Sequence, residues 1–202
     1  MQIHNFIPNE ARKIGLLISG GLDSSLMLYL ITKEIKEKNS NVEFITYTVE
    51  QELKGTVHHT KKIINIIEEL NNISITNIIV GASHAHTDYE IIYGTLDALN
   101  RERKSNQVLD VLYLASTKVP EELKNVNGAP RRDGRNIFSV VQPWSTVNKD
   151  EIVSYILKNN LLELVKNSHS CTMISNKHCG ECWNCIERIW AFDKNNAKSQ
   201  AF

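Results

Sequence analysis

Residues 13–25 read Lys-Ile-Gly-Leu-Leu-Ile-Ser-Gly-Gly-Leu-Asp-Ser-Ser, an apolar run that ends at a pair of glycines. The run from Lys13 to Ser19 is short and apolar, as is typical of a buried strand. Residues 23–38 then carry apolar side chains at helical spacing, with lysines and glutamates on the other face. A buried strand, a glycine turn and an amphipathic helix in this order predict one unit of an α/β fold.

The alternation of strand and helix continues along the rest of the chain. Runs rich in β-branched and aromatic residues predict further strands at 42–49, 73–80, 108–114 and 137–142. Helical spacing predicts helices at 56–70, 89–104, 148–158 and 185–192, the third of them with Asn148 as its N-cap. We therefore expect a doubly wound parallel five-stranded sheet with helices on both faces, and a frayed tail at 195–202.

The composition fits a single domain, residues 1–202, and excludes several classes of protein. Of the 202 residues, 42% are hydrophobic and 23% are charged, so a packed core is feasible and disorder is not expected. Lys+Arg and Asp+Glu both number 23, and this balance argues against binding nucleic acid through bulk charge. There is no secretory signal and no apolar run near the ~20 residues that cross a bilayer. We expect a cytoplasmic protein without membrane partners or direct nucleic-acid contacts.

The glycine turn after the first strand combines features that suit a phosphate ligand. Glycines let the backbone approach an anion, hydroxyls add donors, and a helix N-terminus supplies roughly half a positive charge. The spacing is not that of a Walker A loop, and the acidic Asp23 makes sense if it holds Mg²⁺. An ordinary glycine turn before a capped helix is the alternative. The candidate binding residues are Ser19, Gly20, Gly21, Leu22, Asp23, Ser24 and Ser25.

Residues 19–24, Ser-Gly-Gly-Leu-Asp-Ser, resemble the PP-loop, Ser-Gly-Gly-x-Asp-Ser, of the N-type ATP pyrophosphatases. Members of that family cleave ATP between its α- and β-phosphates and adenylate a carbonyl or carboxyl oxygen, and a nitrogen or sulfur nucleophile then displaces AMP. The resemblance implies an adenine nucleotide alpha hydrolase-like (HUP-type) fold, ATP and Mg²⁺ as cofactors, and a catalytic role for Asp23. It also implies that residues 46–49 flank the adenine.

All the cysteines of the chain fall in one short stretch, with the pattern Cys171-x7-Cys179-x2-Cys182-x2-Cys185. Thiols of a cytosolic protein are kept reduced, so clustered cysteines indicate metal or redox chemistry rather than disulfides. Four thiolates complete a tetrahedral Zn²⁺ shell and leave no open position for a substrate, which favours a structural zinc site within residues 169–192. An iron–sulfur cluster, a redox pair and free thiols are the alternatives.

The C-terminal motifs, taken with the glycine turn, resemble the 7-cyano-7-deazaguanine synthase family. The matching segments are Gln142-Pro143, Lys149-x-Glu-Ile-Val, the cysteine pattern and Glu187-Arg-x-x-Ala-Phe. The resemblance implies that ATP adenylates the carboxylate of 7-carboxy-7-deazaguanine, that ammonia gives the amide, and that a second ATP leads to the nitrile. It therefore implies a deazapurine carboxylate and ammonia as small-molecule partners, and self-association into a homodimer.

The middle of the chain departs from that family's pattern. Residues 88–94 and 116–121 stand where the family has Gly-Arg-Asn and Ser-Gly-Tyr-Pro-Asp-Cys. A PP-loop ligase acting on a different acid or on a macromolecule, and a non-catalytic nucleotide-binding zinc module, are therefore the alternative functions.

Several charged residues have two interpretations each. Lys118, just past the fourth strand, is a candidate catalytic residue that reaches the α-phosphate, or a solvated lysine. The charged loop at 116–136 is either a functional lid or a solvated insertion. Its arginines, which suit phosphates if the loop is a lid, are Arg131, Arg132 and Arg135. We expect the histidines at 58, 59, 84 and 86 to lie on the surface.

Overall fold

The structure is a computed structural model that describes residues 5–51, 55–80, 109–128 and 140–202. Within these residues five parallel strands form one sheet in the order β3-β2-β1-β4-β5. The strands are β1 (Lys13–Leu17), β2 (Glu43–Val49), β3 (Thr76–Val80), β4 (Val111–Leu114) and β5 (Val140–Val141). The predicted α/β fold with a five-stranded parallel sheet is confirmed.

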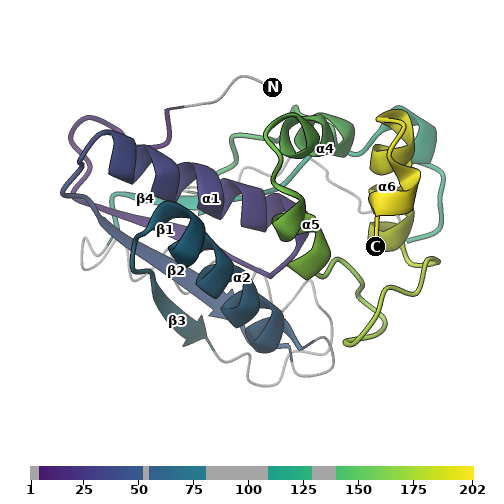
Figure 1. The fold of residues 1–202 in the computed structure, drawn as a ribbon, viewed down its shortest axis with the longest axis horizontal. Coiled ribbons are helices and arrows are strands. Elements are labelled where there is room, and N and C mark those ends of the chain that lie inside the picture. Colours follow the sequence, from purple (N-terminus) through teal and green to yellow (C-terminus); the bar gives the residue numbers. More distant parts are fainter. Residues whose placement is uncertain (1–4, 52–54, 81–108, 129–139) are drawn as a thin grey trace.

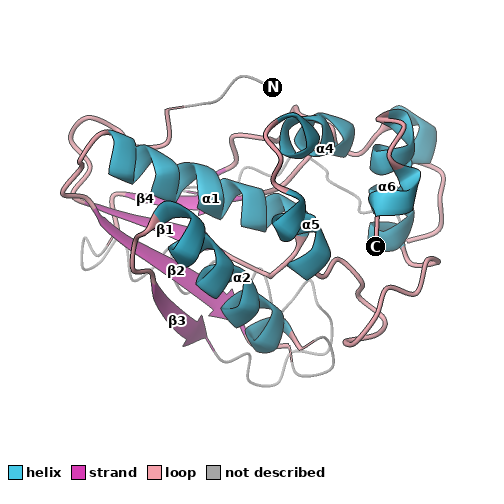
Figure 2. Ribbon diagram, in the orientation of Figure 1, coloured by secondary structure: helices cyan, strands magenta, loops and turns pink. Residues whose placement is uncertain are grey.

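Figures 1 and 2 show α1 and α2 lying across one face of the sheet, with α5 near their ends and α4 next to α6. The helices are α1 (Leu22–Glu37), α2 (Thr56–Asn71), α4 (Lys149–Lys158), α5 (Leu162–Asn167) and α6 (Trp183–Lys194), with short 3-10 helices at Glu121–Leu123 and Lys198–Gln200. The helix expected at 89–104 and residues 137–139 of the fifth strand lie outside the described residues. Among those described, no helix is both long and apolar enough to span a membrane.

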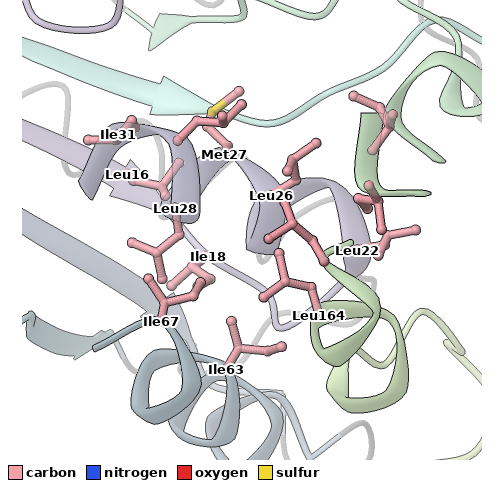
Figure 3. Packing of buried hydrophobic residues seen from close by; sticks show 14 of the residues in the cluster. Leu16, Ile18, Leu22, Leu26, Met27, Leu28, Ile31, Ile63, Ile67 and Leu164 are labelled. Atoms are coloured by element: carbon pink, nitrogen blue, oxygen red, sulfur yellow. The ribbon is translucent and has the colours of Figure 1, made fainter. Parts of the chain in front are cut away.

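Successive side chains of a strand point to opposite sides of the sheet, and on the central strand β1 the side chains on both sides are apolar. Leu16 belongs to a large cluster with residues of α1, α2, α4, α5 and α6. Its neighbour Leu17 belongs to a smaller cluster with Ile45 and Leu112 of the adjacent strands. Figure 3 shows the larger cluster, in which Leu26 of α1 and its neighbours fill the space between helices and sheet. The central strands are thus buried on both faces, as parallel α/β folds require, whereas the edge strand β3 is largely exposed.

The order of the sheet reverses at β1. From this central strand the chain moves to β2 and β3 on one side, whereas β4 and β5 lie on the other. Open α/β sheets bind ligands at the carboxyl ends of their strands where the order reverses. Since residues 18–21 lead directly from β1 into α1, the glycine turn occupies that position.

The C-terminal tail is packed, and the expectation that it is frayed was wrong. Ala197 and Ala201 are buried on either side of the last 3-10 helix. The Phe202 ring stacks on His178 with centroids 4.6 Å apart, and the Ala201 carbonyl accepts a hydrogen bond from the Arg188 guanidinium. These contacts join residues distant in sequence, so the polar local pattern of the tail did not reveal them.

Candidate functional site

Gly20 sits in a position that has no room for a side chain. Its φ is +74°, and a Cβ there would lie 2.7 Å from the Cβ of His59 in α2. Its carbonyl accepts the backbone N–H of His169 at 2.8 Å. The turn therefore needs glycine for its left-handed backbone and for the close approach of two other segments.

The first turn of α1 offers free amides beside this glycine. Gly21 is the N-cap, and no described side chain caps the helix. The first helical hydrogen bond runs from the Ser25 amide to the Gly21 carbonyl at 3.0 Å, so the amides of residues 22–24 have no partner within the helix. The hydroxyls of Ser24 and Ser25 donate to the same carbonyl, at 3.1 and 2.7 Å. Ser19 Oγ accepts the Gly21 amide at 3.3 Å, so the three hydroxyls brace the turn.

A cavity of about 270 Å³ opens at the carboxyl ends of the central strands. Its walls include the glycine turn, the ends of β1 and β4, and Val49 and Gln51 at the end of β2. The remaining lining residues are Thr56, His59, Lys149, Asn184 and residues 169–172. The cavity thus lies where the strand order reverses, and the end of β2 flanks it. That this end of β2 contacts an adenine stays a prediction.

Asp23 lies in the first turn of α1 and lines this cavity. Its Oδ2 is 3.2 Å from the Lys149 ammonium and 3.5 Å from the Thr117 hydroxyl. Its Oδ1 is buried and has no hydrogen-bond partner among the described residues. A buried carboxylate oxygen without a partner, next to free helix amides, suits Mg²⁺ carried by a polyphosphate.

Lys149 occupies the first turn of α4 and is buried between two carboxylates. Its Nζ lies 2.6 Å from Glu187 Oε2 of α6 and 3.2 Å from Asp23 Oδ2. Burial lowers the pKa of Lys149, but the charges of Asp23 and Glu187 outweigh burial and hold the pKa above its ordinary value. Lys149 is therefore protonated at neutral pH.

A stack of aromatic rings packs against the glycine turn and contributes His59 and His169 to the cavity wall. The rings of His59 and His169 are nearly parallel, at 11°, with centroids 4.1 Å apart. His178 follows at 4.9 Å from His169, and Phe202 stacks on His178. Ring nitrogens of His59 and His169 bond to the carbonyls of residues 175 and 174, each at 2.7 Å. His58 is exposed as expected, but His59 is half-buried in this stack.

The stacked histidines are neutral at physiological pH. Burial lowers the pKa of His59 and of His169. Burial, with the nearby charge of Arg188, lowers the pKa of His178 to about 4. In keeping with this, the Nε2 of His178 accepts the backbone N–H of Ser170 at 3.2 Å. The rings form an uncharged wall between the glycine turn and the cysteines.

The cysteine sulfurs converge just before and within the start of α6, and all lie within 4.8 Å of one another. A tetrahedral ion with metal–sulfur bonds of ~2.3 Å places its ligand sulfurs about 3.8 Å apart. The structure has 3.9 Å between Cys179 and Cys185, and 4.0 Å between Cys171 and Cys182. A [4Fe–4S] cluster binds each cysteine to a different iron, which separates the sulfurs by roughly 6 Å. The spacing therefore fits one tetrahedral ion.

Backbone amides stabilise thiolates at this centre. The amides of Glu181 and Cys182 donate to Cys179 Sγ at 3.4 and 3.2 Å. Burial raises the pKa of Cys182, but hydrogen bonds from Thr172 and Cys185 outweigh it and lower the pKa to about 6. Burial and the neighbouring sulfurs of Cys182 and Cys171 raise the pKa of Cys185, so a bound cation would be needed to hold both sulfurs of the pair as thiolates.

Arg188 joins α6 to the segment that precedes the cysteines. It is fully buried, and its guanidinium donates to the carbonyls of Val165 and Ala201 and to the hydroxyls of Ser168 and Ser170. Burial lowers the pKa of Arg188 to about 10, against the opposing charges of Asp23 and Cys185. Arg188 is thus a buried cation whose hydrogen bonds go to uncharged oxygens.

The structure gathers the predicted turn residues at one end of the sheet, although their role in binding stays a prediction. Ser25 differs from the other turn residues because its side chain is buried, and its hydroxyl donates a hydrogen bond to the Gly21 carbonyl. Lys118 is exposed and is not part of the cavity lining, whereas the adjacent Thr117 is buried and faces Asp23. The catalytic role of Lys118 stays a prediction. The arginines at 131, 132 and 135 and the histidines at 84 and 86 lie outside the described residues.

Sequence reasoning did not assign site roles to Lys149, Glu187 or Arg188. Their motifs, Lys149-x-Glu-Ile-Val and Glu187-Arg188, were visible and served only as signs of family resemblance. Three charged residues at predicted helix starts and faces are ordinarily solvated. Only the packing of α4 against α6 shows that they are buried together beside the turn.

A parallel sheet with a glycine turn at its reversal point, a cavity there and a four-cysteine centre fit the HUP-type α/β fold that the sequence resemblance implies. Comparison with solved structures agrees: U34-tRNA thiolase NcsA from Methanococcus maripaludis, with its [4Fe–4S] cluster, superposes with a TM-score of 0.50. It shares 16% identity, and the match covers 93% of this chain and 67% of that one, which is a likeness of fold.

The sequence comparison is more specific for the C-terminal part. The family described as queuosine biosynthesis protein QueC matches residues 119–196, a range that contains Lys149, the cysteines, Glu187 and Arg188. A search of curated protein sequences gives no significant match. The C-terminal part of the chain is therefore similar to the QueC family, in line with the resemblance of its motifs.

Proposed function

We propose that this protein is an AMP-forming ligase that activates a carboxylate with ATP for attack by ammonia. The observation that carries the proposal is the turn at residues 19–25. The amides of residues 22–24, which have no partner within the helix, and the unpaired Oδ1 of Asp23 lie there beside one cavity, in a turn whose backbone requires glycine at position 20. Together they suit a diphosphate with its Mg²⁺. The QueC match supports 7-carboxy-7-deazaguanine as the acid, with its amide and then 7-cyano-7-deazaguanine as products.

In this proposal the chain positions the reactants and stabilises charge. The amides of residues 22–24 bind the departing diphosphate, and Asp23 holds Mg²⁺, which when bound offsets the charge on that group. A carboxylate oxygen of the substrate attacks the α-phosphorus, the bond to the α,β-bridging oxygen breaks, and pyrophosphate leaves. Ammonia attacks the acyl carbon, AMP departs, and loss of a proton gives the amide.

Formation of the nitrile repeats the same activation. The amide oxygen attacks the α-phosphorus of a second ATP and pyrophosphate leaves. Loss of AMP and of the two amide protons then gives the carbon–nitrogen triple bond. Both activations need the electrophile held in line with the α-phosphate, which a single rigid turn can supply.

For the cysteine centre we propose a structural Zn²⁺. The sulfur spacing supports one ion rather than a cluster, and four thiolates complete its shell without an open position. Purified protein should contain one zinc per chain by elemental analysis and show no visible absorption typical of iron–sulfur clusters. Iron with inorganic sulfide at the same site would overturn the assignment.

A ligase for a different acid is the second candidate. The segment 116–121 after β4 lacks the Ser-Gly-Tyr-Pro-Asp-Cys of the deazaguanine enzymes, and its Thr117 contacts Asp23 in the cavity wall. A changed segment beside the reacting groups is the place where a different acceptor would be selected.

Mass spectrometry of a single reaction separates these functions. The protein is incubated with ATP, Mg²⁺, ammonium and 7-carboxy-7-deazaguanine; the amide is lighter than the acid by about one dalton and the nitrile by a further water. AMP released only with another acid supports the second candidate, and ATP bound without AMP release indicates a binding module. Asp23→Asn should abolish AMP release. The matched control Asp193→Asn, an exposed aspartate of α6, should keep it.

A further inference from the structure

Helix α6 carries both cysteine ligands and residues that reach the glycine turn. Cys182 is its N-cap and Cys185 lies in its first turn. Glu187 and Arg188 follow directly and are almost completely buried. An ion that fixes the start of α6 therefore also fixes the position of these two side chains.

The first connection to the turn runs through charges. Glu187 holds the Lys149 ammonium at 2.6 Å, and Lys149 reaches Asp23 at 3.2 Å. Lys149 lies at the N-terminal end of α4, where the helix dipole disfavours a cation, so it depends on both carboxylates. When a cation binds at Asp23, it offsets the carboxylate charge that faces Lys149, and Lys149 then depends more strongly on Glu187.

The second connection runs through hydrogen bonds. The Arg188 guanidinium donates to the hydroxyls of Ser168 and Ser170, on either side of His169. The His169 amide in turn donates to the Gly20 carbonyl at 2.8 Å. Two adjacent residues of α6 are thus linked to the same turn through intermediate groups: Glu187 through Lys149 to Asp23, and Arg188 through residues 168–170 to Gly20.

We infer that the cysteine centre and the nucleotide turn are energetically coupled, with Glu187 and Lys149 as positioning residues that transmit the coupling. This inference rests on the proposed nucleotide binding. Coupling between two sites is reciprocal, so metal in the centre strengthens nucleotide binding and nucleotide strengthens metal retention by the same factor. A purely local structural metal would show neither effect.

The test measures metal release, which does not depend on turnover. Zinc-loaded protein is mixed with a chromophoric chelator, with and without saturating MgATP, and the release rate is followed. We expect MgATP to slow release about tenfold in the wild type, within the usual range of coupling between sites. In Glu187→Gln and Lys149→Met, checked to be folded and to hold one zinc, MgATP should slow zinc release only about threefold, because the connection through Arg188 remains.

A matched control is available on the surface. Glu163 of α5 pairs with Lys166 at 2.7 Å, the same chemistry as the buried pair, but both side chains are exposed. Glu163→Gln should keep the tenfold slowing. If MgATP still slows zinc release tenfold in folded Glu187→Gln or Lys149→Met, the inference is overturned.

The wild type alone provides the reverse measurement if the buried variants do not fold. The affinity for a fluorescent ATP analogue is compared before and after partial zinc removal by chelation. The affinity should weaken about tenfold, the same factor by which MgATP slows zinc release. Wild-type protein that binds MgATP but releases zinc at an unchanged rate overturns the coupling and leaves the proposed function standing. Wild-type protein that does not bind MgATP overturns both.

Discussion

At the scale of single residues, Gly20 is the position where backbone conformation and close packing coincide. Its φ of +74° strains any L-residue, and its Cβ position is already occupied by His59 at 2.7 Å. Gly20→Ala should therefore lower the free energy of unfolding by about 2–4 kcal/mol, from the left-handed backbone and the overlap together. Urea unfolding measures the loss, and equilibrium dialysis should show weakened ATP binding.

Gly128 supplies the control for this substitution. Its φ is +84°, but the nearest atom to an added Cβ is 3.7 Å away, an ordinary contact. Gly128→Ala should lower the free energy of unfolding by about 1 kcal/mol, from the left-handed backbone alone, and should leave ATP binding unchanged. Equal losses for the two variants would show that the contact with α2 does not shape the turn.

Single residues also show how far sequence reasoning reaches into the site. The turn at 19–25 was predictable because glycines, serines and Asp23 are contiguous and their chemistry is local. Lys118 was proposed from its place after a strand, yet the structure leaves it exposed outside the cavity lining. Lys149 is the buried cation beside Asp23, and it comes from a helix more than a hundred residues away. Nothing in a local pattern tells a buried lysine from a solvated one.

At the scale of elements, α6 is held by the contacts of Arg188. Its guanidinium ties the helix to α5 through Val165, to the following segment through Ser168 and to the tail through Ala201. Arg188→Met would leave several buried acceptors unpaired, and we expect it to lower the free energy of unfolding by about 3 kcal/mol. Chemical denaturation measures this loss. Arg12→Met, at an exposed arginine, should change stability by less than about 0.5 kcal/mol.

The elements that were predicted well are the long ones with a clear period. Helices α1, α2 and α4 begin and end within one residue of the expected bounds, since each spans several turns with an apolar stripe. Helix α5 has only six residues and was missed, because so few turns give no period to detect. The strands are shorter than expected, since apolar runs extend beyond the residues that pair in the ladder. The strand order was not predictable, as pairing joins distant segments.

At the scale of the whole molecule, the cysteine centre and the sheet should differ in their response to metal removal. In the proposed zinc site the ion would hold the four cysteines together, whereas the sheet has two apolar clusters of its own. After chelation, hydrogen exchange should accelerate in residues 168–194 and remain slow in β1 and α1, as expected for separate cooperative units. Mass spectrometry of peptides measures this. Simultaneous loss of protection in β1 would mean that the fold depends on the metal throughout.

Nucleotide binding should stabilise the whole molecule because the cavity is built from the ends of the central strands, α1, α4 and the segment before the cysteines. A ligand that binds only the folded state at 100 times its dissociation constant adds about 2.7 kcal/mol, which for a chain of this size raises Tm by about 5–10 °C. Differential scanning calorimetry with MgATP measures the shift.

Mg²⁺-pyrophosphate should give part of this rise in Tm, because the turn is proposed to bind the diphosphate rather than the base. Asp23→Asn should remove the pyrophosphate effect while leaving a smaller response to AMP, which would use the apolar side near Val49. A pyrophosphate shift unchanged in that variant would place the diphosphate elsewhere in the molecule.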